Sequence, residues 1–407
     1  MTLRITQLQY RDELLAELPF PARPLRVLRG LGSGLARDPH DPGLLWAIGD
    51  RGPNMNVKLA CERFGLPLEA HEERKGAKVM PALDIGPSLT ALRISGDRVT
   101  AERHLPLTGP DGAPISGLPI PDGPHHRLEP AIGPDGADLG ADPLGADTEG
   151  VAVMPDGEFW IGDEYGPSLL RVAGDGRVLA RWVPEGTADR FAYPGVEIVE
   201  ALPAIAARRR LNRGFEAIVP SADGRELHLM SQGPLAHPDG DAHAGARHVR
   251  LMTLDIEAER VVRQYAYPCD GAATFRRDVE AGEFAQGDVK VSELTRLPDG
   301  ALLVLERGDR ATKLYRIDLG GAEPLPPEHL DEATRPTLEE LSARGFGGLP
   351  VLEKRLVLST DDHREIGDAL EGMTVLPDGS LILVNDNDFG CEGAETRFWR
   401  VEGLALG

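Results

Sequence analysis

The sequence of 407 residues carries a formal net charge of −22, and 41% of its residues are hydrophobic. This apolar share is large enough for a packed core, which excludes a chain that is disordered throughout. The negative charge argues against a nucleic-acid partner, because such binding relies on Lys and Arg to neutralise phosphates.

The N-terminal segment alternates apolar and charged residues. It lacks the basic start and apolar stretch of a signal peptide, and no later stretch has the length of a membrane span. The three cysteines do not form the pattern of a disulfide framework. From these features we expect a monomeric cytoplasmic protein, with a periplasmic or secreted location if a leader has been removed.

Short strands are predicted from the start of the chain onward. The first two cover residues 3–10 and 25–31, and a first hairpin covers 33–50. In a closed radial fold an N-terminal strand often completes the last blade, so we expect this segment to close the ring. Three stretches interrupt the strand pattern, and we interpret them as rim insertions near residues 54–87, 108–146 and 320–350.

The most informative stretch, residues 147–167, reads DTEGVAVMPDGEFWIGDEYGP. Two apolar runs flank Asp156-Gly157, and an Asp-Gly between alternating strands is a strong hairpin signal. Antiparallel pairing about this turn brings Glu149 close to Asp163 and Glu164 at the opposite end. One hairpin therefore delivers three carboxylates to one edge.

Similar hairpins recur along the chain at intervals of about 70 to 80 residues, beginning at Glu216, Glu293 and Glu371. With a degenerate copy at residues 33–52, five units are visible, and the long gap before Glu149 leaves room for a sixth. We therefore predict one all-β domain over residues 1–407. Its expected architecture is a β-propeller of four-stranded antiparallel blades.

Residues 197–210 are the best helical candidate in the chain. They end in Arg208-Arg209-Arg210, and basic residues are favoured at the negative end of a helix dipole. We interpret this triplet as a solvated helix end.

Acidic residues occupy equivalent strand ends in the repeats, and in a propeller such positions converge on the central channel. Crowded carboxylates need a counter-charge, since repulsion and burial would otherwise protonate some of them. Calcium suits several carboxylate oxygens in loose geometry, whereas zinc would favour His or Cys. The predicted calcium ligands are Asp50, Glu149, Asp163, Glu216, Glu293, Glu371 and Asp386. A purely structural ring of acids paired with Arg51, Arg213, Arg307 and Lys354 remains an alternative.

The order of these motifs resembles the "esterase-like activity of phytase" family, bacterial β-propeller proteins related in architecture to alkaline phytases. The resemblance covers about residues 30–402 and rests on SGLARDPHDPGLLWAIGDRG, DTEGVAVMPDGEFWIGDEYGP, NRGFEAIVPSADGRELHLMSQGPL, VSELTRLPDGALLVLER and LEGMTVLPDGSLILVNDNDFG. It implies a propeller and hydrolysis of a phosphoester or an ester. The catalytic motifs of alkaline phytases are not found here residue by residue.

The leading hypothesis is a calcium-dependent hydrolase that binds a phosphoester or carboxylic ester in the central channel. Glu164 would serve as general base, and Arg51, Arg307 and Lys354 would neutralise an anionic substrate or transition state. One alternative is a metal-dependent sugar lactonase. Another is a binding propeller in which the cation is only structural.

Overall fold

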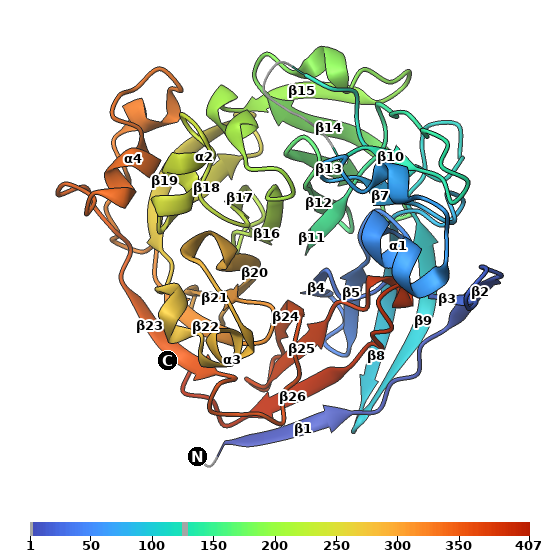
Figure 1. Ribbon diagram of the computed structural model, residues 1–407. Coiled ribbons are helices and arrows are strands. Elements are labelled where there is room, and N and C mark those ends of the chain that lie inside the picture. The colour runs from blue at the N-terminus through green and yellow to red at the C-terminus, as the bar shows by residue number, and fades with distance from the viewer. Residues whose placement is uncertain (1–2, 124–128) are drawn as a thin grey trace.

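The structure, a computed structural model, describes residues 3–123 and 129–407. Five sheets of four or five strands are arranged around a common centre, as in a propeller (Figure 1). The predicted all-β class is confirmed. No helix in these two ranges is long and apolar enough to cross a membrane.

Each of the five sheets is formed mainly from strands that follow one another in the sequence. The first contains β4 (Gly34–Arg37), β5 (Leu44–Ile48), β8 (Ser88–Ser95) and β9 (Arg98–Pro106). The second contains β11 (Thr148–Val153), β12 (Phe159–Asp163), β13 (Ser168–Val172), β14 (Val178–Pro184) and β15 (Glu197–Leu202). The third contains β16 (Phe215–Pro220), β17 (Glu226–Ser231), β18 (His248–Asp255) and β19 (Arg260–Pro268).

The fourth sheet contains β20 (Lys290–Arg296), β21 (Leu302–Arg307), β22 (Thr312–Ile317) and β23 (Lys354–Ser359). The fifth contains β24 (Leu370–Val375), β25 (Leu381–Asn385), β26 (Phe398–Glu402) and β1 (Arg4–Leu8). Strand β1 pairs antiparallel with β26, so the N-terminal strand completes the sheet of the C-terminal strands, as predicted. This pairing joins the two ends of the chain.

The remaining elements lie outside the five sheets. Two small sheets contain β2 (Leu14–Leu18) with β3 (Leu25–Leu28), and β6 (Met55–Asn56), β7 (Lys78–Val79) and β10 (Ala131–Ile132). The α-helices are α1 (Val57–Phe64), α2 (Gly240–Gly245), α3 (Arg276–Ala281) and α4 (Leu338–Ala343). The 3₁₀ turns are η1 (Glu69–His71), η2 (Ala188–Arg190), η3 (Ala204–Arg208), η4 (Ala272–Thr274), η5 (Gln286–Asp288), η6 (Pro327–Leu330) and η7 (Asp388–Gly390). Within the described part of residues 54–146, no sixth sheet of four strands is present.

Asp-Gly turns join the first two strands in four of the sheets. In the second sheet Gly157 has φ +88°, and the Asp156 carboxylate accepts the amide of Glu158 at 3.0 Å. Gly224, Gly300 and Gly379 also have positive φ values. Glycine adopts this conformation without steric cost, which explains why each hairpin turns at that residue.

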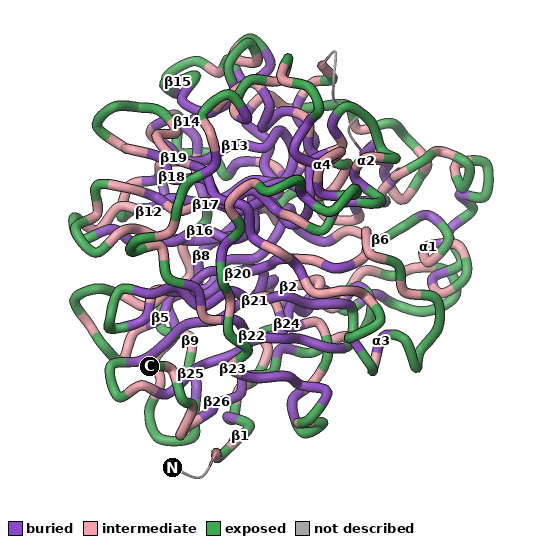
Figure 2. Tube along the Cα trace, turned by 90° about the vertical axis from the view of Figure 1, so that its left-hand side faces the viewer, coloured by how far each residue is buried: buried purple, intermediate pink, exposed green. Residues whose placement is uncertain are grey.

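The innermost strands β4, β11, β16, β20 and β24 contact one another in sequence, and β24 also contacts β4. Glycine permits this close approach, because a Cβ on Gly150 would lie 1.9 Å from the Glu216 carbonyl oxygen. All six residues of β11 are buried. Figure 2 shows the same pattern, with buried residues along the strands and exposed residues at the loops.

The predicted helix over residues 197–210 is wrong. The segment forms β15, which pairs parallel with β14, and then the 3₁₀ turn η3. Ile198 and Val199 are β-branched residues that suit a strand, and both pack against buried core residues. Pro203 follows directly and ends the strand.

Candidate metal centre

Four innermost strands are irregular near their acidic residue. The strand register shifts in β11 between Thr148 and Val151 and in β16 between Phe215 and Ala217; it also shifts in β20 between Val291 and Glu293 and in β24 between Leu370 and Gly372. Such a bulge inserts an extra residue and redirects its side chain. The bulges therefore determine which side chains of the innermost strands depart from the alternating in-and-out pattern near the centre.

The bulge in β20 shows that Glu293 is not equivalent to Glu216 and Glu371, contrary to what the repeat spacing predicts. The unpaired residues in β16 and β24 are Glu216 and Glu371, whereas in β20 the unpaired residue is Ser292. Glu293 is therefore one position out of register. Its carboxylate accepts the backbone amides of Leu35 and Leu294 at 3.0 and 2.9 Å.

Three carboxylates form a compact cluster at the centre. Ligand oxygens of Asp147, Glu149 and Glu164 all lie within 4.8 Å of one another. Their residues are 0%, 7% and 1% exposed. Glu164 follows β12, and its amide donates to the Asp147 carbonyl at 2.9 Å, which fixes the two acids side by side. Across the described residues, neither carboxylate oxygen of Glu164 has a hydrogen-bond partner.

Two further carboxylates share this environment. Burial raises the pKa of Glu149 well above its usual value, and the charges of Asp147, Glu164 and Glu216 add to the effect. Burial also raises the pKa of Glu216, followed by the charges of Glu164 and Glu371. One oxygen of Glu216 accepts a hydrogen bond from Gln232, while the other has no partner in the part of the chain that is described. The neighbouring acids therefore oppose the ionisation of Glu149 and Glu216.

A second acidic group lies near the first. Burial raises the pKa of Asp50 to about 7, with Asp388 adding to the shift. Asp386 accepts the Ser33 hydroxyl at 3.0 Å and the Asp388 amide at 2.9 Å. Asp388 and Phe389 have positive φ values of 45° and 50°, a strained conformation of the kind found at functional sites. The sequence interpretation missed Asp388, although it belongs to the same Asn-Asp-Asn-Asp run as Asp386.

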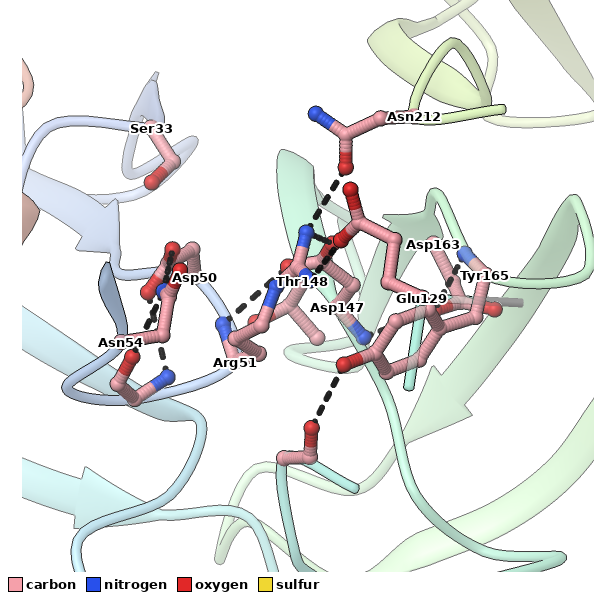
Figure 3. Close-up of polar contacts among 12 residues, drawn as sticks. Ser33, Asp50, Arg51, Asn54, Glu129, Asp147, Thr148, Asp163, Tyr165 and Asn212 are labelled. Atoms are coloured by element: carbon pink, nitrogen blue, oxygen red, sulfur yellow. Dashed lines mark hydrogen bonds and ion pairs between the residues drawn. The ribbon is translucent and has the colours of Figure 1, made fainter. Parts of the chain in front are cut away.

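Arg51 is the main counter-charge beside the cluster. Its guanidinium forms ion pairs with Asp147 and Glu129 and donates to Asn212 at 2.7 Å (Figure 3). It also lies 5.0 Å from the ring centroid of Tyr165. Glu129 belongs to the predicted insertion over residues 108–146, so this loop contributes directly to the centre.

Arg307, Arg209 and Arg213 also lie near the acids. Arg307 is ion-paired with Glu371 and donates to the Ser292 hydroxyl at 2.8 Å. Burial lowers the pKa of both Arg209 and Arg213, while the nearby charge of Glu164 acts in the opposite direction. The Nε atom of each has no hydrogen-bond partner among the described residues.

The Arg208-Arg209-Arg210 triplet is therefore not a solvated helix end. Arg209 is 6% exposed and donates to the Tyr165 carbonyl, which places it beside the acids. Arg210 donates to the Gly287 carbonyl at 3.0 Å, and Arg208 pairs with Glu332 at 3.0 Å. Strand β15 and turn η3 bring Arg209 inward while Arg210 stays exposed, which a helical interpretation could not anticipate.

Two other predicted site residues are held elsewhere. Asp163 forms a buried ion pair with Arg181 at 2.7 Å and accepts the Ser168 hydroxyl at 2.7 Å. Lys354 pairs with Glu306 and with Asp270 and lies 3.7 Å from the Tyr315 ring centroid. Asp163 also accepts the backbone amide of Asp147 at 2.8 Å, so it supports the cluster from outside, whereas Lys354 has its partners away from the cluster.

A family model described as "Phytase-like: Esterase-like activity of phytase" matches residues 27–389, which is most of the chain. The chain belongs to this phytase-like family. The family resemblance inferred from the sequence is confirmed.

Other proteins are similar to this phytase-like chain at lower identity. An uncharacterized secreted protein of the fungus Arthroderma benhamiae is 26% identical over 322 residues, which are 70% of this chain and 60% of that protein. The match thus spans less than two thirds of the relative's length. This relative lends no support to the expected bacterial source or cytoplasmic location.

Two solved structures also match the phytase-like chain. A glucose dehydrogenase has 12% identity and a TM-score of 0.36, with 98% of this chain and 99% of that chain covered. Virginiamycin B lyase from Staphylococcus aureus has 12% identity and a TM-score of 0.33, with the same coverage.

The acidic centre of this phytase-like protein fits a divalent cation. Calcium binds six to eight oxygens and tolerates irregular geometry, and a cluster of carboxylates supplies such donors. Without a cation, the unpartnered oxygens of Glu164 would remain buried beside two other acids, which is costly. Asp147, Glu149 and Glu164 would hold the ion. The charge of Glu216 also acts on Glu149, so Glu216 lies near the same site.

Replacing Asp163 with asparagine should separate the structural acid from the metal cluster. The change leaves the buried Arg181 without its ion-pair partner, so we expect the free energy of unfolding to fall by roughly 3 kcal/mol. Calcium affinity should change less than about threefold, since Asp163 is not one of the clustered acids and an asparagine oxygen can still accept the Asp147 amide. Chemical denaturation and calcium titration would measure the two effects. A large loss of calcium affinity in a folded D163N protein would place Asp163 among the ligands.

Proposed function

We propose that this phytase-like protein is a calcium-dependent hydrolase of phosphoesters or carboxylic esters that acts at its acidic centre. The proposal rests on the environment of Glu164. This residue is buried beside Asp147 and Glu149, and within the described residues neither of its carboxylate oxygens has a hydrogen-bond partner. Buried charge of this kind is stable when a cation is shared between the acids. Family membership supports a hydrolytic activity.

In the proposed function, several of the five sheets contribute to one site. We infer that they form a closed five-bladed propeller, supported by the succession of contacts between the innermost strands. In this arrangement β11, β16 and β24 each carry one acid to the same end of the channel, at their bulges. Three separate blades would then hold one reaction centre.

When bound, calcium would polarise the ester oxygen and lower the pKa of a coordinated water. The position of Glu164 within 4.8 Å of the other two acids favours a ligand role over the general-base role expected from the sequence. Glu216 is the better proton acceptor, because one of its oxygens lacks a described partner and its pKa is raised. A carboxylate with a raised pKa holds a transferred proton more firmly than an ordinary carboxylate does.

Arginine residues would orient an anionic substrate. Arg209 and Arg213 lie close enough to Glu164 for their charges to interact, and each has an unpartnered Nε within the described structure. Guanidinium groups bind phosphate and carboxylate oxygens in a bidentate manner. Arg307 is ion-paired with Glu371, so its share of the binding would require a rearrangement of that pair. Lys354 has no such role in the proposal, because Glu306 and Asp270 engage it.

The test compares the purified protein with calcium and with a chelator against aryl phosphates, aryl carboxylic esters and sugar lactones. Calcium-dependent turnover of a phosphate or an ester would support the proposal, and turnover of lactones alone would favour the lactonase alternative. A rise in melting temperature with calcium, but no turnover of any substrate, would indicate a binding propeller. Absence of both effects would overturn the calcium-dependent function.

Calcium should stabilise the protein more at pH 8 than at pH 5. Burial raises the folded-state pKa of Asp50 to about 7, and it raises the pKa values of Glu149 and Glu216 well above normal. Groups with raised pKa values favour folding at low pH, and this contribution is lost as pH rises from about 4 through about 7. The metal-free centre therefore becomes costly near neutrality, where the same ionised acids bind calcium. Melting curves with calcium and with chelator at each pH would measure the difference, which should widen with pH.

A further inference from the structure

A polar cavity lies outside the acidic centre. It has a volume of about 580 Å³ and lies between the β2–β3 hairpin, the end of α1 and the segment that follows η7. Figure 1 shows β2 and β3 beside α1 at one side of the molecule. Four arginines contribute to its lining: Arg11, Arg23, Arg26 and Arg63. Cavities that bind small molecules commonly have volumes of this size.

The cavity is basic although the whole chain carries a net charge of −22. Its acidic lining residues are Asp12 and Glu395, so four guanidinium groups face two carboxylates. Asp12 is already engaged, because it accepts the amide and hydroxyl of Thr396 at 3.0 and 2.6 Å. By contrast, Arg11, Arg23 and Arg26 form no ion pair among the described residues, whereas the neighbouring Arg29 pairs with Glu13 at 2.8 Å.

Aromatic rings position part of this basic lining. The guanidinium carbons of Arg23 and Arg63 lie 5.9 and 5.7 Å from the ring centroid of Phe64. Cation–π attraction of this kind limits the motion of both side chains. Arg63 also donates to the carbonyl of Glu392, the residue before the lining residue Gly393. Burial raises the pKa of Tyr10 to about 12, so its phenol stays protonated and can donate a hydrogen bond to a ligand.

We propose that this cavity is a binding site for a small organic phosphate, separate from the acidic centre. Its two excess positive charges match a phosphate monoester, which carries about −1.5 to −2 charge near neutral pH. Guanidinium groups fit phosphate oxygens as bidentate donors, and the half-buried ring of Tyr10 can contact the organic part. The site does not depend on the proposed hydrolytic function, since none of its lining residues belongs to the acidic cluster.

Calorimetric titration of the full chain with phenyl phosphate would test the site, with EDTA present throughout. Without calcium the acidic centre repels an anion, so binding there is suppressed. We expect binding by the wild type and roughly tenfold weaker binding for each arginine removed in Arg23→Gln and Arg26→Gln. Arg225→Gln is the matched control, because Arg225 is exposed and lies in a turn of another sheet.

Several outcomes would overturn the proposal. These are no binding in EDTA, unchanged binding in the Arg23→Gln/Arg26→Gln double variant, or an equal loss in Arg225→Gln. Benzoate bound as tightly as phenyl phosphate would contradict the assignment to phosphate. Melting curves of the variants would verify folding. Arg11→Gln, an exposed substitution on the same cavity, should also weaken binding, and unchanged binding in all three single variants would contradict the site. Loss of calcium-dependent turnover alone would affect only the proposed hydrolytic function.

Discussion

Replacing Glu164 with glutamine is expected to weaken calcium binding roughly 10- to 100-fold and to raise the melting temperature of the calcium-free protein. Both effects have one cause. Glu164 is buried within 4.8 Å of Asp147 and Glu149, so its charge is unfavourable without a cation and valuable with one. Glutamine keeps the shape of the side chain and removes the charge.

The two opposite effects distinguish a metal ligand from an ordinary structural acid. Loss of a structural acid would lower the melting temperature with and without calcium. Melting curves and calcium titrations of wild type and E164Q would be compared with E185Q, because Glu185 is an exposed glutamate near the outer edge of the same sheet. If E164Q bound calcium as tightly as the wild type, the cluster would not be the calcium site.

Much of the fold could be predicted from the sequence because hairpin turns are encoded by residues next to the strands that they join. Each Asp-Gly turn lies within a few residues of the strands that it joins, and glycine at that position adopts the required positive φ. The N-terminal strand was predicted from the architecture and pairs with β26. The helix predicted over residues 197–210 was wrong because pairing with β14, a tertiary contact, overrides the local helical preference of this segment.

The site was only partly predictable, and the reason is again physical. Equal spacing of acids suggested that Glu293 matches Glu216, but a bulge moves Ser292 into that position. A bulge changes the register by one residue and so reverses the direction of a side chain. Spacing placed Glu149 and Glu164 together correctly, because one hairpin carries both. Asp147 lies in that same stretch and was missed, since it precedes the strand.

Counter-charges were the hardest part to predict. Arg209 reaches the centre through β15 and η3, and Glu129 reaches Arg51 from an irregular loop. Their sequence neighbours give no sign of these partners. Pairing between distant segments determines them, and hairpin periodicity carries no information about loops. The same limit applies to Asp163. Its position in the hairpin was predicted, but its ion-pair partner Arg181 was not.

Replacing Arg51 with methionine should lower the free energy of unfolding by roughly 3 to 5 kcal/mol. The side chain is 4% exposed and its guanidinium is ion-paired with Asp147 and Glu129, which are also buried. Methionine fills similar space but leaves both carboxylates without their counter-charge. Chemical denaturation would measure the loss, and R225M at an exposed arginine should change the free energy by less than about 0.5 kcal/mol.

The pH dependence of this loss has a defined sign. Burial alone would raise the pKa of Glu129, but the charge of Arg51 and other bases brings it below normal. A lowered pKa stabilises the fold above the unfolded value near 4.3, and that contribution disappears as pH falls. Without Arg51 the buried Glu129 and Asp147 would take up protons at higher pH than in the wild type, so the difference in unfolding free energy between wild type and R51M should narrow as pH falls toward about 4. A double variant, R51M with E129Q, should recover part of the loss, and additive losses would contradict a direct pairing.

Calcium and Arg51 act on the same excess of negative charge, so removing one should increase dependence on the other. Arg51 neutralises Asp147 from one side, and a bound ion would neutralise Asp147, Glu149 and Glu164 from the other. The rise in melting temperature caused by calcium should accordingly be larger in R51M than in wild type, provided that R51M folds. R225M should show the wild-type rise. A smaller rise in R51M would mean that Arg51 supports the cation geometry of the cluster rather than offsetting its charge.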